Sequence, residues 1–177
     1  MNTYVALLRG INVSGQKKVP MAELRELLSK AGLKDVQTYI QSGNVVFRSS
    51  ENEAEKLALR IQNTIEKHFG FEVPTLVKSP KELQQIFDAC PFPEDEKTES
   101  YFMLLFASPS KALVDEVSKI SYSNETFVIT DDCVYLYSSV GYGNAKCNNN
   151  FFERKLKITA TARNYKTMVK LLSLSAD

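Results

Sequence analysis

Lysines, arginines and side-chain amides gather in three short polar stretches of this sequence, and such groups suit the binding of an anion. The first stretch, residues 9–20, holds two glycines, two adjacent lysines and no acid. The second, residues 41–44, and the third, residues 161–164, have the same polar character. Glycines bare backbone N–H groups and lysines add positive charge. We predict that the three stretches are turns that form one positively charged face, but their residue types do not define a reaction there.

The first stretch resembles a phosphate-binding P-loop only superficially. That motif needs a lysine directly after its second glycine, followed by a serine or threonine for magnesium. Gln16 occupies the lysine position after Gly15, and no hydroxyl residue follows it. We therefore exclude a nucleotide-hydrolysing P-loop. An anion site is predicted instead, with the alternative that the glycines only make turns.

The other two stretches also have structural interpretations. Residues 41–44 are typical of a hairpin turn that needs the backbone freedom of glycine and asparagine, and we favour that interpretation. In the functional interpretation, Gln41 and Asn44 would hydrogen-bond a ligand's polar edge. Asn164 is suited to an N-cap, and Arg163 and Lys166 beside a helix start suit an anion. Both properties are compatible at that helix start.

Catalytic and metal-binding patterns are missing from the sequence. The single histidine, His68, has no ligand-spaced neighbours, so no metal is expected, and it is typical of a surface or capping residue. There is no GxSxG elbow and no HExxH helix. Cys147 follows Lys146, whose charge would lower a thiol pKa, but no histidine partner stands near it. The cofactor, if there is one, is unknown.

Cysteine usage and hydropathy indicate a cytoplasmic location. Cys90, Cys133 and Cys147 are odd in number and contain no CxxC pair, which favours reduced thiols. No apolar run approaches the roughly 20 residues of a membrane span, and the start is not a signal peptide. We expect no membrane partner.

The first half of the chain shows the elements that would position these stretches. Residues 4–8 form a continuous apolar run, as in a central strand, and residues 21–31 carry one apolar stripe at helical spacing. We predict two strands, at residues 36–40 and 45–47, on either side of the 41–44 turn. A second helix is predicted at residues 57–69 and a last strand at residues 73–77. This βαββαβ order is the ferredoxin-like unit.

Two capping boxes are predicted from the Ser-x-x-Glu pattern. One pairs Ser50 with Glu53 before the second helix, and the other pairs Ser79 with Glu82 before a third. An acidic connector at residues 94–99 then separates the two halves.

The second half repeats the element order. A second apolar run covers residues 101–106, and further elements are a helix, a hairpin turning at Asp131 and Asp132, a short helix and a final helix from near Asn164. We predict an α+β protein made of duplicated ferredoxin-like (βαββαβ) halves, with an N-terminal half at 1–90 and a C-terminal half at 100–177.

Three segments of the chain are RGINVSGQKKVPMAELRELL, TYIQSGNVVF and TARNYKTMVKLLSL. Together they resemble the DUF1697 family of uncharacterised bacterial proteins. The resemblance covers essentially the whole chain, with Ser14 where the family commonly has glycine and Tyr165 where it has tryptophan. It implies a duplicated ferredoxin-like fold and no established activity. The family's motifs fall on the three polar stretches.

We expect a cytosolic protein that binds a phosphate-bearing ligand, such as a nucleotide or nucleic acid, although no RNP-like segment stands out. The alternatives are an enzyme of unknown class that uses the same loops, or a scaffold without a ligand. Whether the protein is an enzyme, and its oligomeric state, stay open. The predicted ligand-binding residues are Arg9, Asn12, Lys17, Lys18, Gln41, Ser42, Asn44, Arg163, Asn164 and Lys166.

Overall fold

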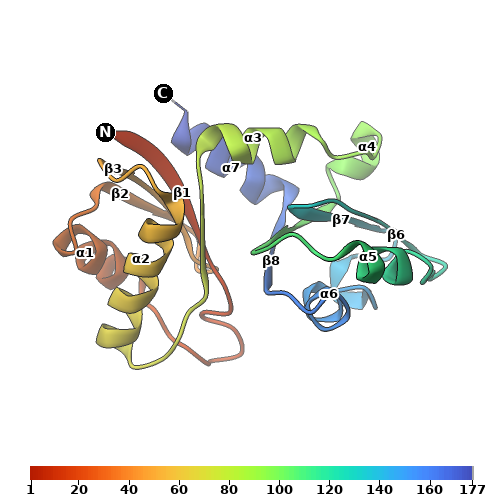
Figure 1. Ribbon diagram of the computed structural model, residues 1–177, viewed down its shortest axis with the longest axis horizontal. Helices are drawn as coiled ribbons and strands as arrows, with labels where there is room; N and C mark the ends of the chain where they lie inside the picture. Colours follow the sequence, from red (N-terminus) through yellow and green to blue (C-terminus); the bar gives the residue numbers. More distant parts are fainter. Residues whose placement is uncertain (177) are drawn as a thin grey trace. The chain divides into compact units, whose positions relative to one another are not determined.

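The computed structural model describes residues 1–176 and divides the chain into two compact units. The first unit consists of Met1–Gln84 and Lys170–Asp177, and the second consists of Gln85–Val169. Each unit holds one four-stranded antiparallel sheet with helices (Figure 1). The protein is therefore a mixed α+β protein, and its two sheets are consistent with a duplication.

The first unit has the strand order β2-β3-β1-β4. Its elements are β1 (Asn2–Leu8), α1 (Met21–Lys30), β2 (Lys34–Tyr39), β3 (Asn44–Ser49), α2 (Ala54–Phe69) and β4 (Thr75–Lys78). The predicted central strand is confirmed, because β1 pairs with β3 on one side and β4 on the other. Helix α3 (Pro80–Asp88) follows and ends in the second unit.

The core of the first unit lies between one face of its sheet and helices α1 and α2. Alternate side chains of β1, namely Tyr4, Ala6 and Leu8, share this core with apolar residues of both helices. The apolar stripes predicted for the two helices are confirmed by buried Leu24 on α1 and Ile61 on α2. Burial of these stripes fixes the helices on the sheet.

The second unit has the strand order β6-β7-β5-β8, the same relative order as in the first unit. Its elements are α4 (Glu94–Lys97), β5 (Tyr101–Leu105), α5 (Lys111–Val117), β6 (Glu125–Ile129), β7 (Cys133–Ser138), η1 (Tyr142–Asn144), α6 (Asn149–Leu156) and β8 (Ala160–Asn164). Helix α7 (Tyr165–Ser175) then runs on into the first unit. The predicted hairpin at residues 131–132 is confirmed by the antiparallel pairing of β6 with β7.

The prediction of a polar turn at residues 161–164 is wrong. These residues belong to β8, which pairs antiparallel with β5. Ala160 and Ala162 pack against the core of the unit, whereas Thr161 and Arg163 alternate with them and are also buried. Small and polar side chains hid the strand, because strand propensity depends more on context than on residue type.

The two predicted capping boxes have different outcomes. Ser79 and Glu82 form the reciprocal pair, with the N–H of Ser79 donating to Glu82 Oε2 (2.8 Å) and the N–H of Glu82 donating to Ser79 Oγ (3.1 Å). The prediction of a capping box at Ser50 is wrong, since the N–H of Glu53 donates to Glu51 Oε1 (3.0 Å) and not to the Ser50 hydroxyl. A neighbouring carboxylate therefore takes the role predicted for the serine hydroxyl.

Gly43, in the turn between β2 and β3, should tolerate no side chain. Its φ of +93° is costly for other residues, and an added Cβ would lie 2.6 Å from Leu8 Cβ and 2.9 Å from Ile11 Cδ1. We expect Gly43→Ala to lower the free energy of unfolding by about 2–5 kcal/mol, from strain and overpacking together. Urea denaturation measures this change.

Gly32→Ala is the matched control, because Gly32 has a similar φ of +99° but open space at its Cβ position. It should cost only about 1–2 kcal/mol from backbone strain. Equal losses for the two variants would contradict the tight packing of Gly43.

Candidate functional site

Residues 9–20, between β1 and α1, fold into a small hairpin. The N–H of Asn12 donates to the carbonyl of Lys17 (3.1 Å), and the N–H of Gln16 donates to the carbonyl of Val13 (2.9 Å). At its tip, Ser14 and Gly15 both have positive φ, +51° and +72°, as in a type I′ turn. The hairpin thus uses some of the backbone N–H groups that a P-loop would offer to a phosphate.

The side-chain amide of Asn12 holds the base of this hairpin. Its Oδ1 accepts the N–H of Val19 (2.8 Å), and its Nδ2 donates to the carbonyls of Val19 (3.0 Å) and Gln41 (2.8 Å). These bonds use both amide hydrogens, so Asn12 joins the first polar stretch to the second. The structure brings two of the three predicted stretches together within the first unit.

The second stretch is a turn between β2 and β3, as its residue types favoured. Asn44 is fully buried, and its Nδ2 donates to the carbonyl of Tyr39 (2.9 Å) and to Ser42 Oγ (3.0 Å). The carbonyl of Gly43 accepts the N–H of Leu8 (2.8 Å), which ties the turn to β1. The amide of Asn44 therefore stabilises the turn, while the Gln41 side chain is exposed.

Three of the predicted cationic residues, Arg9, Lys17 and Lys18, belong to residues 9–20. Lys17 and Lys18 are exposed, and Lys17 Nζ donates to the carbonyl of Glu72 (2.7 Å). Arg9 is half-buried at the end of β1, where its N–H donates to the carbonyl of Pro74 (2.9 Å). The part played by Glu72 was not predicted, because a main-chain carbonyl leaves no signal in residue type.

The third stretch lies in the second unit. Arg163 is 5% exposed, and its Nη1 donates to Thr161 Oγ1 (2.7 Å) and to the carbonyl of Ala162 (2.9 Å). Burial lowers the pKa of the Arg163 guanidinium to about 10, so it stays charged at neutral pH. Asn164 caps α7 as predicted, since its Oδ1 accepts the N–H of Thr167 (2.9 Å), and Lys166 is exposed. That all three stretches form one charged face stays a prediction.

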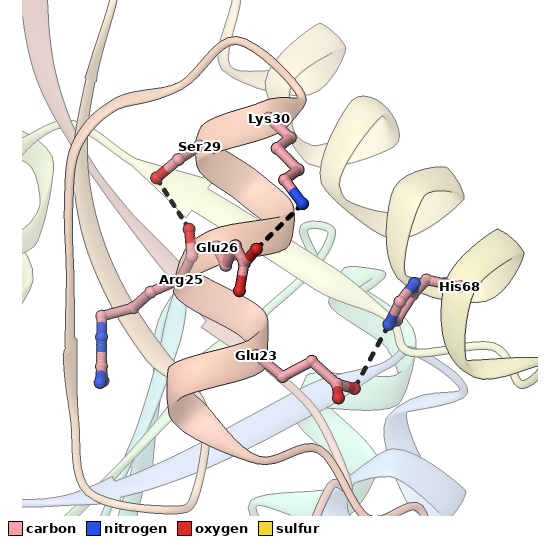
Figure 2. A network of polar contacts seen from close by, with 6 residues as sticks. All are labelled: Glu23, Arg25, Glu26, Ser29, Lys30 and His68. Carbon is pink, nitrogen blue, oxygen red and sulfur yellow. Dashed lines mark hydrogen bonds and ion pairs between the residues drawn. The ribbon is translucent and has the colours of Figure 1, made fainter.

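His68 takes part in a surface contact between two helices. Its Nε2 lies 3.3 Å from Glu23 Oε2, so the ring on α2 faces a carboxylate on α1 (Figure 2). On α1, Glu26 and Lys30 form a further ion pair at 2.9 Å. This setting agrees with the surface role predicted for the histidine.

The cysteines are free thiols, and the suggested activation of Cys147 is wrong. Burial, together with the nearby Glu125 carboxylate, raises the pKa of the Cys147 thiol to about 12. Glu125 accepts the main-chain N–H groups of Lys146 (3.0 Å) and Cys147 (2.7 Å). Burial and the negative charge beside the sulfur therefore raise the pKa that the lysine was predicted to lower.

Over residues 1–176, no group of three or more histidine, cysteine or acidic side chains comes together as a metal site. No helix among the same residues is long and apolar enough to cross a membrane.

Comparison with known proteins supports the family resemblance. Residues 1–135 match the family described as "Protein of unknown function (DUF1697)", and the chain belongs to this family. The structure of the conserved bacterial protein SP0830 from Streptococcus pneumoniae is similar, with 24% sequence identity, a TM-score of 0.75 and 98% of each chain covered. That similarity shows the fold. No curated protein matches the chain.

Replacing Asn12 with alanine should weaken the fold. The change would leave the buried N–H of Val19 and two carbonyls without their amide partner. We expect a loss of about 2–4 kcal/mol in the free energy of unfolding, measured by urea denaturation, since each unsatisfied buried group costs about 1–3 kcal/mol.

Gln41→Ala is the control, because only the main-chain carbonyl of Gln41 contacts Asn12. This exposed substitution should change stability by less than about 0.5 kcal/mol. A stability loss no larger for Asn12→Ala than for Gln41→Ala would contradict the structural role of Asn12.

Proposed function

We propose that the protein binds an anionic, phosphate-bearing ligand, such as a nucleotide or nucleic acid, through its basic loops. The observation that carries this proposal is the hairpin locked by Asn12, which presents Lys17 and Lys18 on a backbone with fixed ends. A fixed backbone lowers the entropy lost when the loop binds. Exposed ammonium groups supply charge-assisted hydrogen bonds to phosphate oxygens.

The predicted residues of the first unit would have two kinds of role, ligand contact and support of the loop. Lys17, Lys18 and Gln41 have exposed side chains and would contact the ligand. Asn12 and Asn44 would hold the backbone of these loops in place and would not contact the ligand, since both amides donate to groups of the protein itself. The remaining predicted residues of the first unit, Arg9 and Ser42, would complete the same site.

In the second unit, the start of α7 would bind an anion by itself. Lys166 is exposed, and the first turn of a helix carries partial positive charge. Buried Arg163 would add a charge, and Asn164 would order the turn as its N-cap. This site in the second unit would not depend on the hairpin.

Further proposals concern fold and location. The βαββαβ order of elements and the matching strand orders support ferredoxin-like halves, with domains at 1–90 and 100–177. Three free cysteines support a cytoplasmic location.

A scaffold without a ligand is the second candidate. It is favoured by the internal use of the Asn12 and Asn44 amides, two of the polar groups first assigned to a ligand. In this case the loops would only hold the sheet edges together. Binding measurements separate the two functions.

Isothermal titration with inorganic pyrophosphate, ATP and a single-stranded RNA tests the proposal. We expect binding of at least one probe that weakens with added salt, because exposed charges are screened. The double variant Lys17→Gln/Lys18→Gln should bind about tenfold more weakly, which corresponds to about 1.4 kcal/mol.

Lys30→Gln/Lys56→Gln is the charge-matched control. Both lysines are exposed: Lys30 pairs with Glu26 on α1, and Lys56 on α2 pairs with Glu53, the residue before that helix. The control should keep wild-type affinity, and both double variants should keep the wild-type unfolding midpoint. No binding of any probe would favour the scaffold, and equal weakening by both double variants would contradict a site at the hairpin.

A further inference from the structure

The first unit also contains a groove of about 510 Å³ on the face of its sheet that lies away from α1 and α2. The end of α7 forms one wall through Leu174. The floor comes from β1, β2 and β3, where Thr3 lies opposite Arg48 and Gln37 lies opposite Val46. A groove of this volume is large enough for a small molecule.

An irregularity in β2 shapes one side of this groove. Lys34 is paired with Arg48 and Gln37 with Val46, so β2 has one residue more than β3 between the two pairs. Asp35, inside this irregular segment, has a φ of +50° and lines the groove. Such bulges re-aim side chains and are common beside functional sites. The bulge thus puts a carboxylate next to the guanidinium of Arg48.

The charges of this pair are weakly engaged with each other. Arg48 Nη1 lies 3.7 Å from Asp35 Oδ2, and Arg48 Nη2 lies 3.5 Å from the carbonyl of Met1. The side chains of Arg48 and Asp35 are 50% and 66% exposed. An exposed ion pair at this distance contributes little stability, so both groups have capacity for stronger partners.

The charged and apolar groups of the groove are complementary to a zwitterion with an apolar side chain. A guanidinium binds a carboxylate in bidentate fashion, and an aspartate accepts hydrogen bonds from an ammonium. A ligand with only a carboxylate would meet the negative charge of Asp35, whereas a zwitterion matches both charges. Val46 on the floor and Leu174 on the wall are apolar and suit an aliphatic group.

We propose that this groove binds a free α-amino acid with an aliphatic side chain. Arg48 contacts the carboxylate, Asp35 the ammonium, and Val46 and Leu174 the side chain. This site lies apart from the hairpin residues and does not depend on the proposed binding of phosphate.

Titration of the ¹⁵N-labelled full chain with L-leucine, followed by NMR, tests the proposal. We expect saturable shifts of the Gln37 and Arg48 amides with a Kd of about 1 mM, in the range of a weak, exposed site. Arg48→Gln and Asp35→Asn should each weaken binding by about fivefold or more, which is about 1 kcal/mol. Lys56→Gln, an exposed change on α2, should leave it unaltered.

Two leucine analogues separate the roles of the charges. 4-Methylpentanoate lacks the ammonium and 3-methylbutylamine lacks the carboxylate, so each should bind about fivefold more weakly than leucine. Binding of either analogue as tightly as leucine would overturn the zwitterion assignment. Absence of saturable shifts at these amides up to about 50 mM leucine would overturn the site itself.

Discussion

The hydrogen bonds of one half-buried side-chain amide, that of Asn12, organise the part of the first unit on which the proposed function depends. Its three main-chain contacts, to Val19 twice and to Gln41, join a loop after β1 to the turn between β2 and β3. An asparagine amide can donate two hydrogen bonds and accept others, so it can link two segments where a hydrophobic side chain cannot. The close packing of Gly43 against Leu8 completes this junction. Together these contacts fix the position of the backbone that carries Lys17 and Lys18.

Much of the secondary structure could be predicted from the sequence, because burial leaves periodic patterns. The continuous apolar run in β1 and the apolar stripes of α1 and α2 are examples. Strand β8 could not be predicted, since Thr161 and Arg163 look like turn residues and are buried only through tertiary contacts. The failed capping box has a similar cause: the Glu51 carboxylate, close in sequence, competes with the Ser50 hydroxyl.

The role of each residue in the candidate site could not be predicted from its type. Asn12 and Asn44 were predicted as ligand contacts, yet their amides are bonded to the protein's own main chain. Lys17 is held by the carbonyl of Glu72, a partner that any residue type would offer. The thiol of Cys147 shows the same limit, because burial and the carboxylate of Glu125, far away in the sequence, both raise its pKa.

The hairpin held by Asn12 is proposed to present its lysine ammonium groups to a phosphate. The most direct measurement is NMR of the lysine side-chain nitrogens, with Nζ of Lys17 and Lys18 assigned by single substitutions, during titration with pyrophosphate at low salt. We predict saturable shifts at these two Nζ atoms, with little change at Nζ of Lys30 and Lys56, and reversal by added salt. Shifts of equal size at all four lysines, or none at Lys17 and Lys18, would contradict the account.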